Sequence, residues 1–161
     1  MFSVEEITDI LNKIKDLIHT FNPNAEVIFT LSPVRHLKDG YIENTQSKAH
    51  LISAIHQVVD SSDLMHYFPS YEIMMDELRD YRFYKSDMIH PSAQAIDFIW
   101  EKFKSIWIDS KLNGTLKIIK RIQNGLQHKP MNSNSEAHQN FLKSIDSEID
   151  SLNREFPQLK F

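Results

Sequence analysis

Apolar residues near the start of the chain recur every three to four positions, which is the spacing of one face of an α-helix. They are Val4, Ile7, Leu11, Ile14, Leu17, Ile18 and Phe21. Ser3 and Glu6 have the spacing of a capping box before this stripe, and residues 22–24, Asn-Pro-Asn, interrupt it. The pattern therefore predicts a helix that begins after Ser3 and ends before residue 22.

Two short runs have the pattern of strands instead. EVIFTL (26–31) is almost continuously apolar and is bounded by turn residues, which is typical of a buried parallel strand. LMHYF (64–68) is a second candidate of the same kind. A helix, a short break and a buried strand in succession indicate the α/β class, with a short parallel sheet.

Polar stretches follow both predicted strands. SPVRHLKDGYIENTQ (32–46) has no clear period and is predicted to be a loop, with a second helix beginning at Ser47. After the second strand we predict a short helix over 70–79 and then a polar, aromatic loop. Ligands bind beyond the carboxyl ends of the strands in open α/β sheets, so both loops are candidate site regions.

Three further helices are predicted toward the C-terminus. Ser92 is placed to cap a helix that reaches about Ile108, with Ile96, Ile99, Trp100, Phe103 and Trp107 on its buried side. A basic helix over 115–125, ended by Gly125, precedes a linker over 127–135. The final helix carries Phe141, Ile145, Ile149, Leu152 and Phe156, nearly a heptad seam. We expect a domain over 1–112 and a helical extension over 113–161, packed as a hairpin on the domain or on another subunit.

Composition narrows the classes of function. The chain has no cysteine, which excludes disulfides, thiolate metal sites and a cysteine nucleophile. Its net charge of -4 does not match a nucleic-acid-binding surface. The chain shows no signal-peptide pattern, and no apolar run reaches the roughly 18 residues that a membrane span requires. We expect a cytoplasmic protein without nucleic-acid or membrane partners.

The stretch DMIHPS (87–92) carries the clearest chemistry. Asp87 and His90 lie within one tight turn, where a carboxylate can orient an imidazole for general base catalysis. Pro91 stiffens the start of the following helix. The alternative is structural: Asp87 is a turn residue and His90 a surface or packed histidine.

The context of this motif resembles a known family. An Asp-x-x-His-Pro block supplies the acid and base of the Ser-His-Asp triad in SGNH (GDSL-like) hydrolases. TLSPVRHLKDGYIENTQSKAHL (30–51) and the longer stretch YFPSYEIMMDELRDYRFYKSDMIHPSAQAIDFIWEKF (67–103) are similar to the C-terminal half of the bacterial GSCFA family. The resemblance covers about residues 1–110. It implies part of a flavodoxin-like, three-layer α/β/α unit and assigns Asp87 and His90 as catalytic residues.

The same resemblance implies that a nucleophile is missing. The family takes its name from a Gly-Ser-Cys-Phe-Ala block, whose serine matches the SGNH nucleophile, and this sequence contains no such block. Neither Ser32 nor Ser47 lies in a nucleophile-elbow pattern. We therefore expect a fragment, or a shortened product, that is inactive alone and whose true N-terminus is missing.

Other candidate residues lie in the loop after the first strand. Arg35 and His36 are candidates for binding the substrate or the oxyanion. Ser32 is a third candidate, although a serine in this position before a proline is more often a turn residue. Arg79 and Arg82 are expected to pair with nearby acids. The histidines do not have the spacing of a zinc site, so we expect no metal and no cofactor.

Two hypotheses about function remain open. The first is a serine esterase or acyl-hydrolase acting on a small ester or acylated substrate. The second is a non-catalytic binding or assembly module. Because a half-sheet leaves an exposed edge, we also expect a homo-oligomer formed through the strand at 26–31 or the C-terminal helix.

Overall fold

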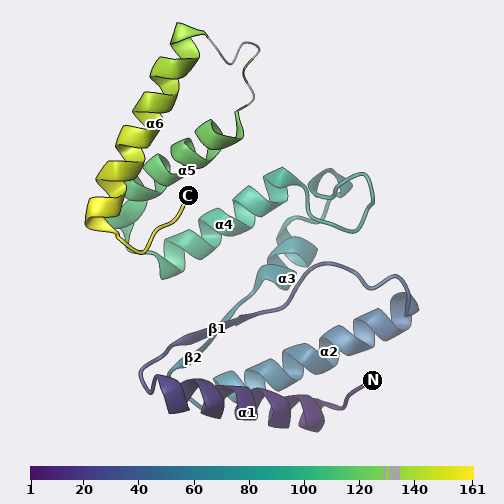
Figure 1. Ribbon diagram of the computed structural model, residues 1–161. Coiled ribbons are helices and arrows are strands. Elements are labelled where there is room, and N and C mark those ends of the chain that lie inside the picture. The colour runs from purple at the N-terminus through teal and green to yellow at the C-terminus, as the bar shows by residue number, and fades with distance from the viewer. Residues whose placement is uncertain (129, 131–134) are drawn as a thin grey trace. The chain divides into compact units, whose positions relative to one another are not determined.

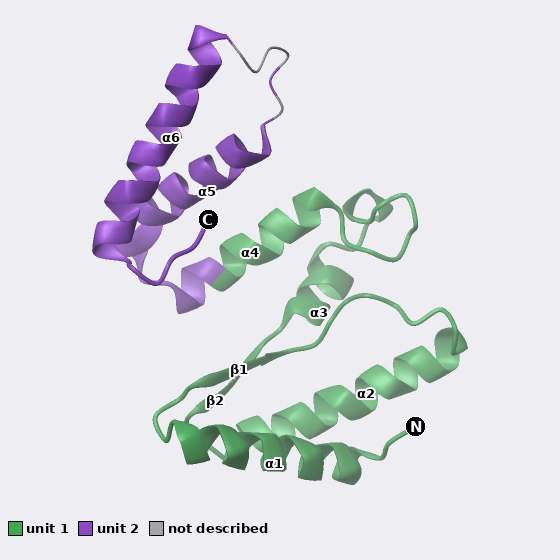
Figure 2. Cartoon of the chain, viewed as in Figure 1, with its two compact units in different colours: residues 1–103 green, residues 104–161 purple. Residues whose placement is uncertain are grey.

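The computed structural model describes residues 1–128, 130 and 135–161. The chain divides into two compact units, residues 1–103 and 104–161 (Figure 2). Of the predicted linker over 127–135, residues 129 and 131–134 lie outside the described residues. No helix within the described residues combines the length and apolar character needed to cross a bilayer.

The first unit begins with the predicted amphipathic helix, α1 (Val4–Phe21). Both hydrogen bonds of the capping box form: the Glu6 amide donates to Ser3 Oγ, and the Ser3 amide donates to Glu6 Oε2 at 2.8 Å. α1 packs against α2 (Gly40–Val59), as Figure 1 shows. The prediction for this helix is confirmed at both ends.

The sheet of the described residues has two parallel strands, β1 (Val27–Thr30) and β2 (Met65–Phe68). Val27 pairs with Met65, and Thr30 with Phe68. α2 is the crossover that a parallel pair requires. The predicted α/β class, with its short parallel sheet, is confirmed. Buried apolar residues of this unit come mainly from α2, β2 and the segment after β2: Ala54, Ile55, Val58, Met65, Phe68, Ile73, Met74 and Leu78.

The start of α2 differs from the prediction. The helix begins at Gly40, so Ser47 lies within it and does not cap it. The first turns have inverted polarity, because Tyr41 and Ile42 are exposed while Asn44 and Lys48 are buried. A helix whose inward face is polar lacks the apolar period by which amphipathic helices are identified.

The segment after β2 is helical, as predicted, but irregular. α3 (Ser70–Glu72) continues into a π-helix, η1 (Ile73–Glu77), and a 3₁₀-helix, η2 (Tyr81–Phe83), follows. α4 (Ala93–Trp107) begins after Ser92, whose Oγ accepts from the amide of Ala95 at 3.3 Å. Ser92 therefore caps α4, as predicted.

One prediction for α4 is wrong. Ile96 and Trp100 were expected to be buried, yet both are exposed. Their side chains line an open cavity between α4 and the strands, so this face is covered only in part. A helical stripe predicts which face is apolar but cannot predict how much structure covers that face.

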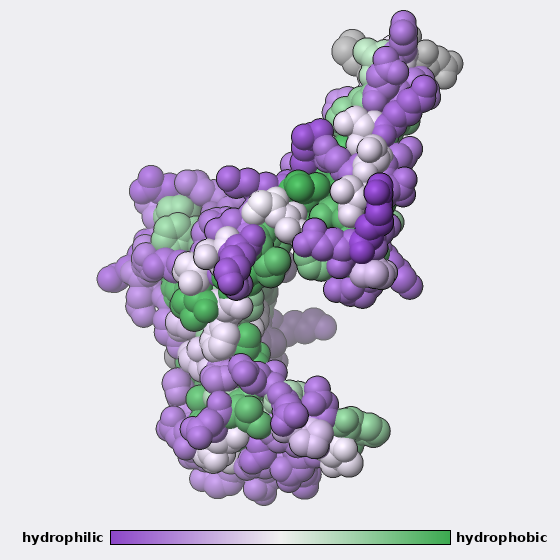
Figure 3. All heavy atoms as spheres, turned by 90° about the vertical axis from the view of Figure 1, so that its left-hand side faces the viewer, coloured by the Kyte–Doolittle hydropathy of each residue, from purple (hydrophilic) through white to green (hydrophobic). Residues whose placement is uncertain are grey.

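The second unit contains the end of α4, the 3₁₀-helix η3 (Ser110–Leu112), α5 (Asn113–Gln127) and α6 (Glu136–Glu155). The predicted seam of α6 packs on α5, with Ile122, Ile145 and Leu152 at its centre. Gly125 lies inside α5 instead of ending it. A Cβ there would come within 2.8 Å of Ile145 Cδ1, so this glycine permits close helix packing. On the face shown in Figure 3, hydrophilic residues predominate and apolar residues form smaller areas, as amphipathic helices require.

Candidate active site

The DMIHPS motif forms a short hairpin that is closed by its own backbone. Tyr84 and Pro91 form an isolated antiparallel bridge. The Lys85 amide donates to the His90 carbonyl at 2.8 Å, and the Met88 amide donates to the Lys85 carbonyl at 2.9 Å. Met88 has a φ of 61°, in the left-handed region that non-glycine residues seldom adopt. The turn is therefore tight and locally determined.

This turn brings Asp87 and His90 into contact. Asp87 Oδ2 lies 2.8 Å from His90 Nδ1. Asp87 Oδ1 accepts from the amides of Ile89 and His90, each at 2.9 Å. The hydrogen bonds from the His90 and Ile89 amides, followed by that from the His90 ring, lower the pKa of Asp87 to about 2. The carboxylate is thus ionised at neutral pH and selects the imidazole tautomer that carries its proton on Nδ1.

The pair is open to solvent, with side-chain exposed fractions of 52% for His90 and 42% for Asp87. In the tautomer selected by Asp87, Nε2 of His90 is the free base. Among the described residues, no hydroxyl group is hydrogen-bonded to the His90 ring. An imidazole held by a carboxylate in this way can act as a general base, but in the described part of the chain no hydroxyl group stands beside it as a nucleophile.

The three candidates after β1 occupy one loop, and their environments differ. Ser32 is exposed, and its Oγ accepts from the Val34 amide at 3.2 Å, which is a local turn contact. The His36 side chain is exposed, whereas Arg35 is half-buried and its guanidinium lies 5.8 Å from the centre of the Tyr41 ring. The hydrogen bonds of Ser32 do not connect it to the Asp87–His90 pair.

Two buried polar residues of α2 hold this loop, a role that the sequence pattern did not predict. Lys48 is only 4% exposed, and its Nζ donates to the Ser32 carbonyl at 2.6 Å. Asn44 Oδ1 accepts from the His36 amide at 2.8 Å. Burial lowers the pKa of Lys48, whose ammonium also lies 5.4 Å from the centre of the Tyr71 ring. The i,i+4 spacing of Asn44 and Lys48 places both on the face of α2 that meets the loop.

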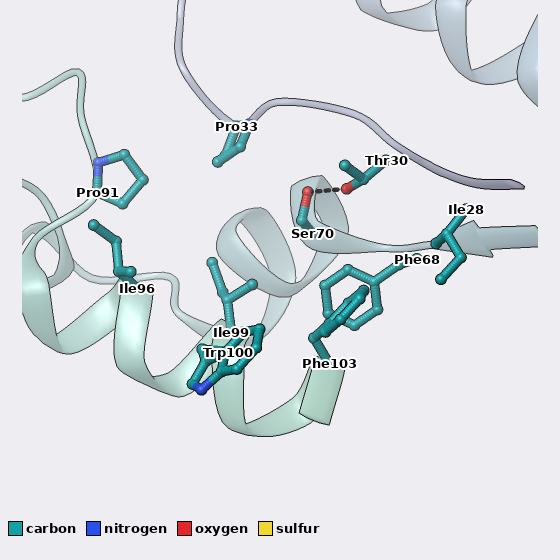
Figure 4. Close-up of a pocket in the computed structure, with 10 residues that line it drawn as sticks. All are labelled: Ile28, Thr30, Pro33, Phe68, Ser70, Pro91, Ile96, Ile99, Trp100 and Phe103. Carbon is teal, nitrogen blue, oxygen red and sulfur yellow. Dashed lines mark hydrogen bonds between the residues drawn. The ribbon is translucent and has the colours of Figure 1, made fainter. Parts of the chain in front are cut away.

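An apolar cavity of 490 Å³ lies next to the hairpin (Figure 4). Pro91 borders it from the hairpin, and Pro33 borders it from the loop after β1. The other lining side chains come from the strands, the start of α3 and α4: Ile28, Thr30, Phe68, Ser70, Ile96, Ile99, Trp100 and Phe103. Its volume is within the range of small-molecule sites.

The two hydroxyl groups in this cavity are already engaged. Ser70 Oγ donates to the Leu31 carbonyl at 2.8 Å and is also hydrogen-bonded to Thr30 Oγ1. Since Ser70 uses its one proton on Leu31, Thr30 is the donor in the second bond. These bonds tie the end of β1 to the start of α3 and do not direct either hydroxyl toward His90.

A second cavity, of 290 Å³, is more polar. Arg35 and Arg79 line it, together with Tyr81 and Tyr84. Arg82 pairs with Asp80 at 3.2 Å, as predicted. The same prediction for Arg79 is wrong: among the described residues, no carboxylate forms an ion pair with it. Leu78 leaves the helical region just before Arg79, so the helical spacing to the earlier acids is lost.

Metal ligands do not gather in the described part of the chain: no group of three or more His, Asp or Glu side chains is placed to hold an ion. The Asp87–His90 contact is a pair, and its hydrogen bonds are those of an acid and an imidazole.

Comparison with family models gives two matches. The model described as the GSCFA family matches residues 1–103. The model described as the GSCFA domain protein, C-terminal domain, matches residues 119–161. Searches of curated proteins and of solved structures returned no match.

Proposed function

Because the chain belongs to the GSCFA family, we propose that its first unit carries the acid and base of an SGNH-like serine esterase or acyl-hydrolase. The observation that supports this most directly is the 2.8 Å contact between Asp87 Oδ2 and His90 Nδ1. Two backbone amides fix the same carboxylate, so the imidazole has one orienting partner in a defined position.

In the proposed reaction, Nε2 of His90 accepts the proton of a serine hydroxyl while that oxygen attacks the ester carbonyl. The imidazolium then returns the proton to the departing alcohol, and an acyl-serine remains. Water, deprotonated by the same nitrogen, releases the acid and regenerates the serine. Asp87 remains ionised throughout and stabilises the imidazolium, which its lowered pKa favours.

The nucleophilic serine is proposed to come from a Gly-Ser-Cys-Phe-Ala block outside these 161 residues. Ser32 Oγ accepts from the nearby Val34 amide, and Ser70 Oγ donates to the Leu31 carbonyl, so neither is hydrogen-bonded to His90, which supports this assignment. The apolar cavity beside Pro91 is a suitable place for the acyl chain of a small ester. The loop with Arg35 and His36 is held by Lys48 and Asn44, and donors to developing negative charge need such fixed positions.

Labelling with a fluorophosphonate probe tests the proposal. The 161-residue chain alone should not react, whereas a longer protein that includes the serine block should be labelled. In that longer protein, His90→Gln and Asp87→Asn should each slow labelling and ester hydrolysis by about 10³ to 10⁴. His128→Gln and Asp109→Asn are matched controls, because Asp109 also accepts a backbone amide hydrogen bond but contacts no histidine.

Labelling of the short chain would contradict the missing nucleophile, and full activity of His90→Gln in the longer protein would contradict the catalytic pair. The second outcome would favour the alternative, a non-catalytic binding or assembly module. The lack of a hydroxyl group on His90 among the described residues is the observation that favours this alternative. Self-association through the edge of β1 or through α6 remains part of that proposal, and a monomer in sedimentation at high concentration would count against it.

A further inference from the structure

The cavity lined by Arg35 and Arg79 also borders the hairpin, at a different residue from the apolar cavity. Tyr84 lines the cavity with the arginines, and its bridge partner Pro91 lines the apolar cavity. The hairpin that carries Asp87 and His90 therefore borders two cavities of different character. The proposed hydrolase places its acyl chain in the apolar cavity and uses Arg35 as a donor, but it assigns no role to the cavity that Arg35 shares with Arg79.

Two guanidinium groups from different elements line this second cavity. Arg35 comes from the loop after β1, and Arg79 follows η1. Within the described part of the chain, neither arginine is ion-paired with a carboxylate. Asp80 is the one acid in the lining, and its carboxylate is already occupied by the side chain and the amide of Arg82. The cavity thus has two cationic groups whose charges are not neutralised by the protein.

Two arginines that line one cavity match a doubly charged oxyanion. Arginine donates pairs of N–H groups in a planar fork, the geometry that phosphate oxygens accept. The backbone around Arg35 is restrained, because Lys48 binds the chain at Ser32, three residues before it, and Asn44 binds it at His36, the next residue. A donor that is already restrained loses less conformational entropy when the ligand binds.

The remaining walls indicate that the ligand is larger than a free phosphate. Tyr81 and Tyr84 lie with their ring centres 6.3 Å apart, and Tyr81 is largely exposed. Met74 and Met75 complete the apolar part of the lining. A volume of 290 Å³ is at the lower limit of small-molecule sites, which leaves room for an organic group beside a phosphate.

We propose that Arg35 and Arg79 together bind the phosphate group of a small phosphate monoester, with Tyr81 and Tyr84 contacting its organic part. This inference goes beyond the proposed hydrolase and does not depend on it, since binding requires no nucleophile. Arg79 becomes a binding residue that the sequence analysis assigned to an ion pair. The π-helix η1 ends at Glu77, and Leu78, which is not helical, connects it to Arg79.

Calorimetric titration of the 161-residue chain with phenyl phosphate tests the proposal. We expect one phenyl phosphate per chain, and about tenfold to a hundredfold weaker binding in both Arg35→Gln and Arg79→Gln. Lys38→Gln removes the same charge from the same loop without touching the cavity, and it should bind as the unsubstituted chain does. If each arginine instead bound a ligand independently, each substitution would halve the number of phenyl phosphate molecules bound per chain. That result would overturn the shared site.

Two comparison ligands test the identity of the bound group. Inorganic phosphate should bind more weakly than phenyl phosphate, and Tyr81→Ala should remove this difference. Benzoate, with one charge and the same ring, should bind more weakly than phenyl phosphate at equal ionic strength. Equal binding of inorganic and phenyl phosphate, equal or tighter binding of benzoate, or no saturable binding of phenyl phosphate would overturn the proposal. Arg35 is half-buried and Arg79 is exposed, so circular dichroism should show that both variants remain folded.

Discussion

The two loops that carry the candidate residues are held in different ways. The loop after β1 depends on another element, because Lys48 and Asn44 of α2 bind its backbone at Ser32 and His36. The hairpin with Asp87 and His90 depends on itself, through its own backbone bridge and the Asp87 carboxylate. The Asp87–His90 pair, called the dyad below, is therefore held by local structure, whereas the position of Arg35 is a consequence of tertiary packing.

This difference predicts that the two loops respond independently to substitution. A change in α2 should displace the loop after β1 and leave the Asp87–His90 contact intact. A change in the hairpin should alter the dyad and leave the stability of α2 and β2 almost unchanged. Residue-level NMR signals from the first unit can separate these responses, which a single global unfolding curve of a two-unit chain cannot.

The largest effect on stability is expected for Lys48→Ala. The substitution removes a buried side chain and leaves the Ser32 carbonyl without its 2.6 Å donor. A loss of packing and of one buried hydrogen bond should lower the free energy of unfolding of the first unit by about 2 to 4 kcal/mol. Urea titrations followed by the signals of α2 and β2 measure this loss.

Lys13→Ala is the matched control, because Lys13 is an exposed lysine in α1 of the same unit and its substitution should have almost no effect.

The pH dependence of stability gives a second check on Lys48. Burial lowers the folded-state pKa of Lys48, so the unfolded chain binds more protons between that pKa and the ordinary value of 10.5. The free energy of unfolding of the unsubstituted chain should therefore increase with pH in this window. Lys48→Ala should not show this increase. Equal alkaline profiles would contradict the lowered pKa of Lys48.

The same comparison explains what could be predicted from the sequence. α1, β1, β2 and the cap of α4 follow from local patterns, and the Asp87–His90 contact joins residues only three positions apart. Their physical causes lie within short stretches, so a single sequence contains the necessary information. The catalytic assignment of the pair was carried by the resemblance to a family, and it remains a proposal.

The missed features all depend on residues that are distant in sequence. Asn44 and Lys48 are polar residues on an inward face. The start of α2 therefore lacks an apolar period, and for this reason the sequence pattern predicted a loop there. Gly125 resembles a helix end until Ile145 is known to pack against it. Arg79 was expected to pair with the acids beside it, but the chain turns after η1 and places it in a cavity with Arg35. Each outcome was determined by tertiary contacts.

A smaller effect on stability, confined to acid pH, is expected in the hairpin when Asp87 is protonated or replaced. The pKa of Asp87 is lowered from 3.8 to about 2, so its contribution to stability is complete above 3.8 and is lost as the pH falls toward 2. Asp87→Asn should remove this acid-dependent part of the unfolding curve of the hairpin. The carboxyl carbon shift of Asp87, followed by NMR through this range, measures the pKa directly.

Measuring the pKa of Asp87 in two variants tests whether the hairpin is held by its own residues. The backbone amides of His90 and Ile89 are the largest causes of the lowered pKa, so His90→Gln should leave most of the shift in place. Lys48→Ala should leave the pKa of Asp87 unchanged if the hairpin is self-contained. A pKa that returns to 3.8 in either variant would show that the dyad depends on more than its own backbone.

The smallest effect is expected for Met88→Gly. Met88 has a φ of 61°, and a non-glycine residue in the left-handed region costs about 1 to 2 kcal/mol. Glycine relieves this cost but loses more conformational entropy on folding, about 0.5 to 1 kcal/mol. The net result should be a stabilisation of the hairpin by about 0.5 to 1 kcal/mol, measurable as slower amide exchange at Lys85 and Ser92, which close the turn. Met88→Ala keeps the backbone cost while removing the side chain, so it should not stabilise the hairpin. If glycine instead lowers protection while alanine does not, the turn does not store backbone strain, and the hairpin is held by contacts beyond its own residues.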